Sequence, residues 1–219
     1  MRISTIAVST LAAALAFGCA TQQMDEKTMA AAEKQQPAPA KASPALMTGA
    51  STAMLANTCA GCHGTGGASM GPAIPSISGL EEEYFVDVMN QYKSGERAAT
   101  IMDRVAKGYS DSEIEAMAGY YSGMKFRPVR QTSVGPMAMR GARLHEEYCE
   151  KCHEDEGREP EDIVLAGQWM PYLLWTMEDF SDGKSKIVEK KMAKAMEKML
   201  AAHGKQSLMD LTNFYGSRK

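Results

Sequence analysis

The same five-residue pattern occurs twice in the chain, as Cys59-Ala60-Gly61-Cys62-His63 and as Cys149-Glu150-Lys151-Cys152-His153. In each copy the two cysteines lie three positions apart, and a histidine directly follows the second one. Two thiols at this spacing can form thioether bonds to both vinyl groups of one porphyrin, and His63 or His153 can then reach the iron as its proximal ligand. The pattern therefore predicts two covalently bound haem c groups.

Two other uses of paired cysteines fit the sequence less well. A redox-active disulfide does not require a histidine directly after the second cysteine, and here the histidine is present in both copies. A structural zinc site usually joins cysteine or histidine pairs that lie close together in the chain, whereas Cys149 follows Cys59 by 90 positions. Haem attachment is favoured over both alternatives.

An internal repeat extends beyond the two motifs. The offset between matching residues is 90 at the motifs, 88 through the middle of each half, 90 again at the paired methionines and 94 near the ends. The matched pairs include Pro72 and Pro160, Gly79 and Gly167, Tyr84 and Tyr172, Met89 and Met177, Gly95 and Gly183, Met102 and Met192, and Tyr121 and Tyr215. Two halves of one design that differ by small loop changes explain this pattern.

The N-terminus has the layout of a targeting segment. Arg2 is followed by an apolar stretch over 3–17 and by the small residues Gly18 and Ala20, which is typical of a secretory signal over 1–20. No apolar run in the 219 residues is long enough for a membrane-spanning helix. We therefore expect export to the periplasm, an oxidising compartment in which cysteines are paired or otherwise occupied. The net charge of −3 does not suggest a nucleic-acid partner.

Composition and punctuation divide the rest of the chain. The segment that follows the signal is rich in Ala, Gln, Pro and Lys without apolar periodicity, as a disordered tether would be. Pro128, Gly135 and Pro136 mark a connector between the two halves. The expected organisation is a tether over 21–47, a first domain over 48–124, a connector over 125–136 and a second domain over 137–219.

Apolar residues at helical spacing predict the helices of each domain. A short helix should lead into each motif, and a second helix should follow over 81–93 and over 170–181. Ser110 and Glu113 have the spacing of a capping box, which predicts the start of the last helix of the first domain. Strand patterns are absent, so we expect an all-α fold of two related domains.

Methionines are the natural candidates for the distal iron ligands. Only two histidines lie outside the motifs, and His145 lies just before Cys149, from where it cannot easily reach the far face of the haem. Met102 lies 39 residues after His63, and Met192 lies 39 residues after His153. We therefore predict Met102 and Met192 as distal ligands, with Met196 and Met199 as neighbouring alternatives in the second domain. The remaining matched pair, Met89 and Met177, fits the core faces of helices.

Pro72 and Pro160 occupy matching positions after the two motifs. A proximal histidine is held by a hydrogen bond from its second ring nitrogen, often to a backbone carbonyl. The matching positions favour this role for the two prolines over a simpler role in shaping each loop.

These features together resemble the class I cytochromes c. In that family a proline after the haem motif offers its carbonyl to the proximal histidine, and a methionine ligand precedes the C-terminal helix. The tandem arrangement is similar to the periplasmic dihaem cytochrome c-four group. It is more similar still to the dihaem cytochrome subunit of flavocytochrome c sulfide dehydrogenase. The resembling stretches are 59–63, 71–75, 99–110, 148–153, 165–169 and 171–173, within a likeness that covers nearly all of 48–219.

The resemblance implies an electron-transfer role. The chain would accept electrons from a flavoprotein that oxidises sulfide and pass them to a redox-protein acceptor of a respiratory or photosynthetic chain. The sequence shows no acid–base pair or substrate pocket, so we expect an electron-transfer subunit and not an enzyme on its own. One alternative is a general c-four-type shuttle to a terminal oxidase. Another is a dihaem peroxidase, but the matched methionines argue against the open distal site that it requires.

Cys19 has two alternative fates. It ends the stretch Leu15-Ala16-Phe17-Gly18-Cys19, which resembles the bacterial lipoprotein box, where the signal (here 1–18) is cut before a cysteine that is then acylated. The alternative is ordinary cleavage after Ala20, which would discard Cys19. The flexible segment over 21–47 favours a lipid anchor, because an anchored domain needs a spacer to reach partners away from the membrane.

Charge is distributed unevenly over the second half. Six lysines lie between Lys184 and Lys198, beside the predicted ligand Met192. Acidic residues crowd the second motif: Glu146, Glu147, Glu150, Glu154, Asp155, Glu156, Glu159, Glu161 and Asp162. Two interpretations remain open, a pair of solvated faces or a charge-polarised domain that is steered toward its partner.

Overall fold

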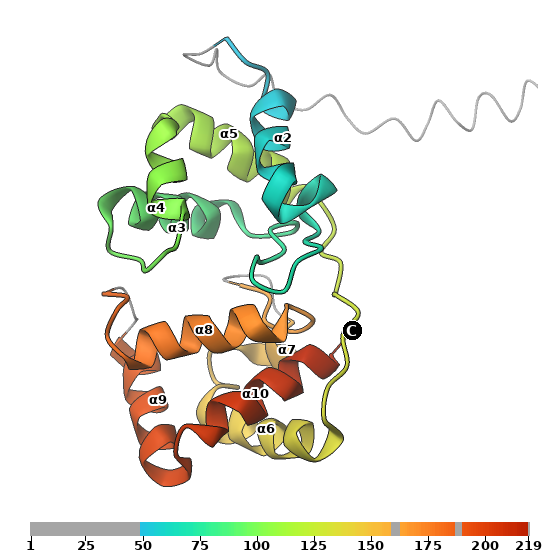
Figure 1. The fold of residues 1–219 in the computed structure, drawn as a ribbon, viewed down its shortest axis with the longest axis vertical. Coiled ribbons are helices and arrows are strands. Elements are labelled where there is room, and N and C mark those ends of the chain that lie inside the picture. The colour runs from blue at the N-terminus through green and yellow to red at the C-terminus, as the bar shows by residue number, and fades with distance from the viewer. Residues whose placement is uncertain (1–48, 159–162, 187–189, 219) are drawn as a thin grey trace, which may run out of the picture. The chain divides into compact units, whose positions relative to one another are not determined.

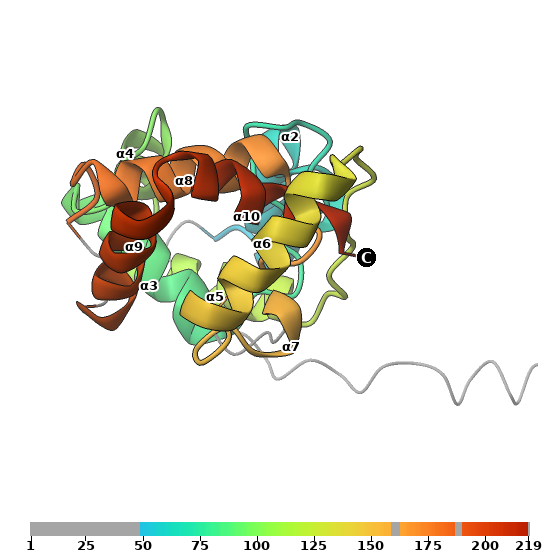
Figure 2. The same ribbon diagram turned by 90° about the horizontal axis from the view of Figure 1, so that it is seen from below.

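The computed structural model describes residues 49–158, 163–186 and 190–218, which belong to one compact unit. Within these ranges the chain forms helices, turns and irregular segments and no strand, so the all-α prediction is confirmed (Figure 1, Figure 2). No helix in the same ranges is both long and apolar enough to cross a membrane. The predicted signal (1–20), the tether (21–47), Cys19 and Pro160 lie outside the described residues.

Among the described residues, the first half contains four α-helices and two short 3-10 turns. They are α2 (Thr52–His63), η1 (Thr65–Gly67), α3 (Glu82–Ser94), α4 (Met102–Val105), η2 (Ala106–Gly108) and α5 (Asp111–Ser122). The predicted helix over 81–93 corresponds to α3. The predicted capping box is present at α5, where Ser110 Oγ accepts a hydrogen bond from the Glu113 backbone N–H at 3.3 Å. The Glu113 carboxylate accepts one from the Ser110 backbone N–H at 2.8 Å.

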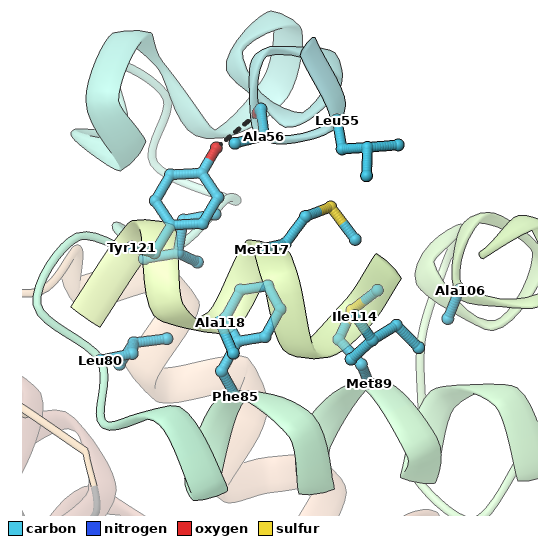
Figure 3. Packing of buried hydrophobic residues seen from close by; sticks show 11 residues of the cluster. Leu55, Ala56, Leu80, Phe85, Met89, Ala106, Ile114, Met117, Ala118 and Tyr121 are labelled. Atoms are coloured by element: carbon cyan, nitrogen blue, oxygen red, sulfur yellow. Dashed lines mark hydrogen bonds between the residues drawn. The ribbon is translucent and has the colours of Figure 1, made fainter. Parts of the chain in front are cut away.

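The core of the first half lies between α2, α3 and α5 (Figure 3). Tyr121 of α5 stacks on Phe85 of α3 with 5.9 Å between the ring centroids, and its hydroxyl donates a hydrogen bond to the Ala56 carbonyl of α2 at 2.7 Å. Met89 is buried in this cluster, which agrees with its expected role in packing, and Met117 of α5 is buried beside it. The core therefore ties the helix that carries the first motif to the two helices that follow it.

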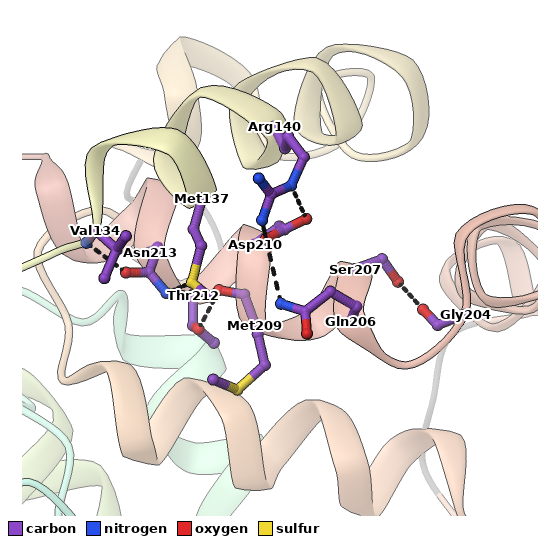
Figure 4. Close-up of polar contacts among 10 residues, drawn as sticks. All are labelled: Val134, Met137, Arg140, Gly204, Gln206, Ser207, Met209, Asp210, Thr212 and Asn213. Atoms are coloured by element: carbon purple, nitrogen blue, oxygen red, sulfur yellow. Dashed lines mark hydrogen bonds and ion pairs between the residues drawn. The ribbon is translucent and has the colours of Figure 1, made fainter.

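In the described part of the second half there are five helices. They are α6 (Gly135–Tyr148), α7 (Glu154–Gly157), α8 (Met170–Ser181), α9 (Lys190–His203) and α10 (Gln206–Ser217). α6 and α10 approach closely at Gly141, where a Cβ atom would lie only 2.7 Å from Phe214 Cβ and still closer to the backbone of Asp210. Figure 4 shows the adjacent ion pair, in which Arg140 donates two hydrogen bonds to Asp210 at 2.7 and 2.8 Å. The helix that precedes the second motif is thus fixed against the last helix.

The repeat found in the sequence is also a repeat of backbone hydrogen bonds. The Gly67 carbonyl accepts from two successive backbone N–H groups of the following loop, those of residues 77 and 78, and the Gly157 carbonyl accepts from those of residues 165 and 166. The Gly79 N–H donates to the Tyr121 carbonyl, and the Gly167 N–H donates to the Tyr215 carbonyl. Three matched pairs of glycines share a left-handed φ, namely Gly67 with Gly157, Gly79 with Gly167, and Gly95 with Gly183. Only glycine adopts this conformation without strain.

A helix-free segment joins α5 to α6 and contacts the second half along its course. The Val129 N–H donates to the Gly167 carbonyl at 2.8 Å, and Gln131 Nε2 donates to the Gln168 carbonyl at 2.6 Å. A Cβ atom at Gly167 would lie 2.6 Å from Pro128 Cβ, so this close approach also requires glycine. These hydrogen bonds and this close packing hold the connecting segment against the loop that leads into α8.

Candidate haem sites

The first motif lies at the C-terminal end of α2. Ser51 caps the start of this helix, because its Oγ accepts a hydrogen bond from the Met54 backbone N–H at 3.3 Å. Cys59 is half-buried and Cys62 is exposed, and His63 is the last residue of the helix. Gly64 follows with φ of 77°, which turns the chain away from the helix. One continuous helix therefore presents both attachment cysteines and the proximal histidine.

His63 is buried and is oriented by the loop that follows the motif. Its Nδ1 donates a hydrogen bond to the Pro75 carbonyl oxygen at 2.9 Å, which leaves Nε2 for the iron. Burial lowers the pKa of His63, although the Pro75 hydrogen bond acts in the opposite direction. The imidazole is therefore neutral near pH 7, which is the form that ligates a metal.

The acceptor is Pro75 and not the predicted Pro72. Ile74 N–H donates to the Gly71 carbonyl at 3.2 Å, and this tight turn leaves Pro72 exposed on its outside. The prediction relied on the repeat, and the residue that matches Pro75 at an offset of 88 is Ile163. A backbone carbonyl can be supplied by any residue type, so a match between side chains in the repeat does not identify the residue that accepts this hydrogen bond. Pro160, the proposed counterpart in the second half, lies outside the described residues.

A cavity of about 550 Å³ opens beside this histidine. Cys59, Cys62, His63 and Met102 all line it, and the rest of its wall is mostly apolar. Both the volume and the lining are those of a cofactor pocket. The residues therefore fit a haem that is bonded through Cys59 and Cys62. Met102, at the start of α4, is partly buried against the core and lines the same cavity. This position is compatible with its predicted role as the distal ligand, which stays a prediction.

Arg97 is a cation that sequence reasoning missed. Its guanidinium also lines the cavity, 5.7 Å from the ring centroid of Tyr92 and 5.8 Å from that of Phe180. Burial opposes its charge, but the neighbouring hydroxyls of Tyr84 and Tyr172 outweigh this effect and raise the pKa of Arg97.

Among the described residues, no carboxylate forms an ion pair with Arg97. A haem carries its own carboxylates, which such a group would hold. The repeat gave no hint of this residue, because Ser185 stands at the matching position.

The second motif has a different backbone conformation. α6 ends at Tyr148, and the motif continues in turns in which the Cys149 N–H donates to the His145 carbonyl and the His153 N–H donates to the Cys149 carbonyl. Cys149 is half-buried and Cys152 is exposed, as Cys59 and Cys62 are in the first half. Burial raises the pKa of the Cys149 thiol to about 11. The four cysteines that were predicted to hold haem thus have matching exposure in the two halves.

His145 is fully buried, and both of its ring nitrogens contact protein groups. Nδ1 is hydrogen-bonded to the Tyr215 hydroxyl at 2.9 Å, and Nε2 contacts the Glu150 carboxylate. Neither nitrogen is therefore available to iron. The other histidine outside the motifs, His203, is exposed and lies 3.4 Å from the Tyr148 hydroxyl.

The distal ligand of the second half remains open between neighbouring methionines. Met192 lies in the first turn of α9 and is partly buried, three positions after the last of the undescribed residues 187–189. Met196 packs against the second core together with Cys149, and Met199 is buried within that core. Met192 stays the prediction, because it alone has the same spacing from its motif as Met102.

The family model that matches the chain, over residues 45–120, is described as cytochrome c oxidase, cbb3-type, subunit III. The cytochrome subunit of sulfide dehydrogenase from Chlorobaculum tepidum is 44% identical over 71 residues, which are 32% of this chain and 64% of that protein. Cytochrome c-554(548) from Halomonas halodenitrificans is 37% identical over 30% of this chain and 82% of its own length. Cytochrome c4 from Pseudomonas aeruginosa is 28% identical over 67% of this chain and 81% of its own length.

A solved structure shares the arrangement of both halves. The reduced cytochrome c4 from Pseudomonas stutzeri superimposes with a TM-score of 0.66, at 20% identity, over 78% of this chain and 100% of that chain. At this identity the likeness concerns the fold, which is that of two tandem domains. Together with the two motifs, the internal repeat and the cavity beside His63, these findings place the chain in the cytochrome c family, as a dihaem class I electron-transfer protein with one covalently bound haem c in each half.

Proposed function

We propose that this cytochrome accepts electrons from the flavoprotein subunit of a sulfide dehydrogenase and passes them to a redox protein of a respiratory or photosynthetic chain. The observation that carries the proposal is the 44% identity, over 71 residues, between this chain and the cytochrome subunit of a sulfide dehydrogenase. That match spans 64% of the relative's length, so the relative's partner is assigned to this chain by inference. Each iron would cycle between its ferric and ferrous states while the protein sets the two potentials.

The mouth of the first cavity supplies a surface at which a donor could approach. Ile101, Val105 and Trp175 line the cavity and are also exposed, with Ile101 and Trp175 each at 50%. Large exposed apolar side chains of this kind are enriched at the centres of protein interfaces. A donor that covers them would bring its flavin close to the haem edge, and the electron would enter through the first half.

The proposal includes export to the periplasm, which the signal-like N-terminal residues support. The periplasm offers an oxidising compartment, and acylation of Cys19 would hold the protein at the membrane by a tether of residues 21–47. The intact mass of the mature protein decides between the two fates of Cys19. A lipid-modified N-terminus at Cys19 is expected, whereas an unmodified chain that begins at Thr21 would rule out the anchor.

The direct test mixes the oxidised dihaem protein with a purified sulfide dehydrogenase flavoprotein. On addition of sulfide, we expect the α-band absorbance of both haems to rise much faster than it does with sulfide alone. The matched control replaces the flavoprotein with the same protein stripped of its flavin. Equal rates with and without a functional flavoprotein would contradict the proposed donor.

The second candidate is a general shuttle of the cytochrome c4 type that delivers electrons to a terminal oxidase. The longer match, 162 residues at 28% identity to a cytochrome c4, favours it. A shuttle of this type would be reoxidised by membranes that contain the oxidase, yet it would show no preference for the sulfide-oxidising flavoprotein over other reductants. The same mixing experiment therefore separates the two candidates.

A further inference from the structure

Gln168 lies in the loop that leads into α8 of the second half, and its side chain is hydrogen-bonded to the backbone of the first half. Its side chain is completely buried, and its two polar atoms both bind Ser76. Oε1 accepts a hydrogen bond from the Ser76 backbone N–H at 3.0 Å, and Nε2 donates one to the Ser76 carbonyl at 2.8 Å. Ser76 is itself buried, so neither partner can exchange this pairing for water.

The bonded N–H belongs to a peptide group that already serves the first haem site. The Ser76 N–H and the Pro75 carbonyl are the two ends of one peptide unit, and that carbonyl accepts the hydrogen bond from His63 Nδ1 at 2.9 Å. A peptide group that donates through its N–H is polarised, which makes its carbonyl a better acceptor. Gln168 is therefore connected to the proximal ligand through a single planar unit.

Gln168 is in turn held rigidly by its own half and by the connecting segment. Its carbonyl accepts from Gln131 Nε2 at 2.6 Å, and Gln131 Oε1 accepts from the Met170 N–H at 3.0 Å. The preceding residue, Gly167, donates its N–H to the Tyr215 carbonyl at 2.9 Å. The residue that matches Gln168 in the first half is Leu80, whose side chain has no hydrogen-bonding group. The contact thus runs in one direction, from the second half to the first haem site.

We propose that Gln168 is a positioning residue for the proximal ligand of the first haem, and that through it the second half lowers the reduction potential of that haem. A firmer bond from His63 Nδ1–H to the Pro75 carbonyl makes the imidazole a more basic ligand. A more basic ligand stabilises the ferric state over the ferrous state. Loss of the Gln168 contact should therefore raise the potential of the first haem and leave that of the second unchanged.

The test compares three kinds of variant in the complete two-haem protein. Gln168→Met and Gln168→Leu both remove the acceptor for the Ser76 N–H, and having two such variants guards against a folding defect in one. Gln168→Glu keeps that acceptor, loses the donor to the Ser76 carbonyl, which belongs to the next peptide unit, and adds a carboxylate at this buried position. Trp169→Phe is the matched control, since it removes a different hydrogen bond between the halves, from Trp169 Nε1 to the Ser69 carbonyl at 3.3 Å.

The readout is the midpoint potential of each haem, followed by NMR during a redox titration. The resonances of the first haem are assigned by their contacts with Tyr109, which lines the first cavity. We expect a higher potential for the first haem in Gln168→Met or Gln168→Leu. Gln168→Glu should give a potential at or below the wild-type value, because a carboxylate accepts from the Ser76 N–H at least as strongly as the amide does. Trp169→Phe should stay near wild type. Three results would overturn the proposal: an unchanged first potential in the Met and Leu variants, an equal shift in Trp169→Phe, or equal shifts of both haems.

Discussion

Replacing Gly141 with alanine tests how tightly the second half is built around its haem motif. Gly141 lies in α6, seven positions before the end of that helix at Tyr148. An added Cβ atom would lie 2.6 Å from the Asp210 carbonyl carbon and 2.7 Å from Phe214 Cβ, and it would meet the Asp210 carbonyl oxygen at still shorter range. Ordinary van der Waals contact requires 3.4 Å or more. α6 and α10 must therefore separate by about 1 Å to admit one methyl group.

The expected loss of stability follows from two opposing effects. Overpacking at a site that cannot yield costs about 3 kcal/mol, at the upper end of the usual range, because backbone atoms and not a flexible side chain form the obstacle. Alanine in place of glycine inside a helix returns about 1 kcal/mol through backbone entropy. The free energy of unfolding should fall by about 2 kcal/mol. The ion pair between Arg140 and Asp210 would be strained by the same displacement.

The assay is guanidinium denaturation of the two-haem protein, followed by far-UV circular dichroism and by the absorbance of each haem. Gly119→Ala is the matched control, because Gly119 is an exposed residue of α5 whose nearest neighbour would lie 3.8 Å from the new Cβ. That variant should be as stable as wild type or slightly more stable. If Gly141→Ala is no less stable than Gly119→Ala, the close approach of α6 and α10 does not exist as described.

Four further outcomes follow from the haem sites and from the charge of α9. The mature protein should carry two haems that survive acid–acetone extraction, and denaturing mass spectrometry showing one addition or none would refute double attachment through the two motifs. Met102→Ala should abolish the methionine–iron charge-transfer band of the first haem and lower its potential. Met192→Ala should do the same for the second haem, and an effect of Met196→Ala in its place would reassign that ligand. Electron transfer to an acidic partner should weaken steeply with salt if the four exposed lysines of α9, Lys190, Lys191, Lys194 and Lys198, steer docking, whereas a salt-independent rate would leave them as a solvated face.

The features that the sequence predicted well are those that local chemistry dictates. The spacing of Cys59 and Cys62 and the adjacent His63 are constrained by the porphyrin itself, so they can be recognised without a fold. The capping box of Ser110 and Glu113 is an exchange of hydrogen bonds over three residues, and it is present as expected. The repeat was readable for the same reason, because glycines with left-handed φ, such as Gly79 and Gly167, must keep their identity at each turn.

The features that the sequence did not predict depend on long-range geometry or on backbone atoms. The Pro75 carbonyl leaves no side-chain signature, so a neighbouring proline with a matching partner was assigned its role. Arg97 and Gln168 have no counterpart of the same type in the other half, so comparison of the two halves does not indicate a role for either residue. Their significance emerges only when residues 92 positions apart, such as Ser76 and Gln168, are seen to form two hydrogen bonds.

These unmatched residues show where the two halves have diverged. In the alignment of the two halves, Arg97 corresponds to Ser185, Leu80 to Gln168 and Leu55 to His145. Gln168 and Ser185 both form hydrogen bonds to the first half, with Ser76 and with the Ala98 N–H. Tyr172, Trp175 and Phe180 of the second half also line the first cavity, so both halves build the environment of the first haem. Because burial and hydrogen bonding of the proximal histidine tune a haem potential in addition to the ligand set, the two haems should differ in potential even if both have the predicted His–Met ligation. That difference gives an electron a preferred direction between them, and it arises from the contacts that break the repeat and not from the motifs that define it.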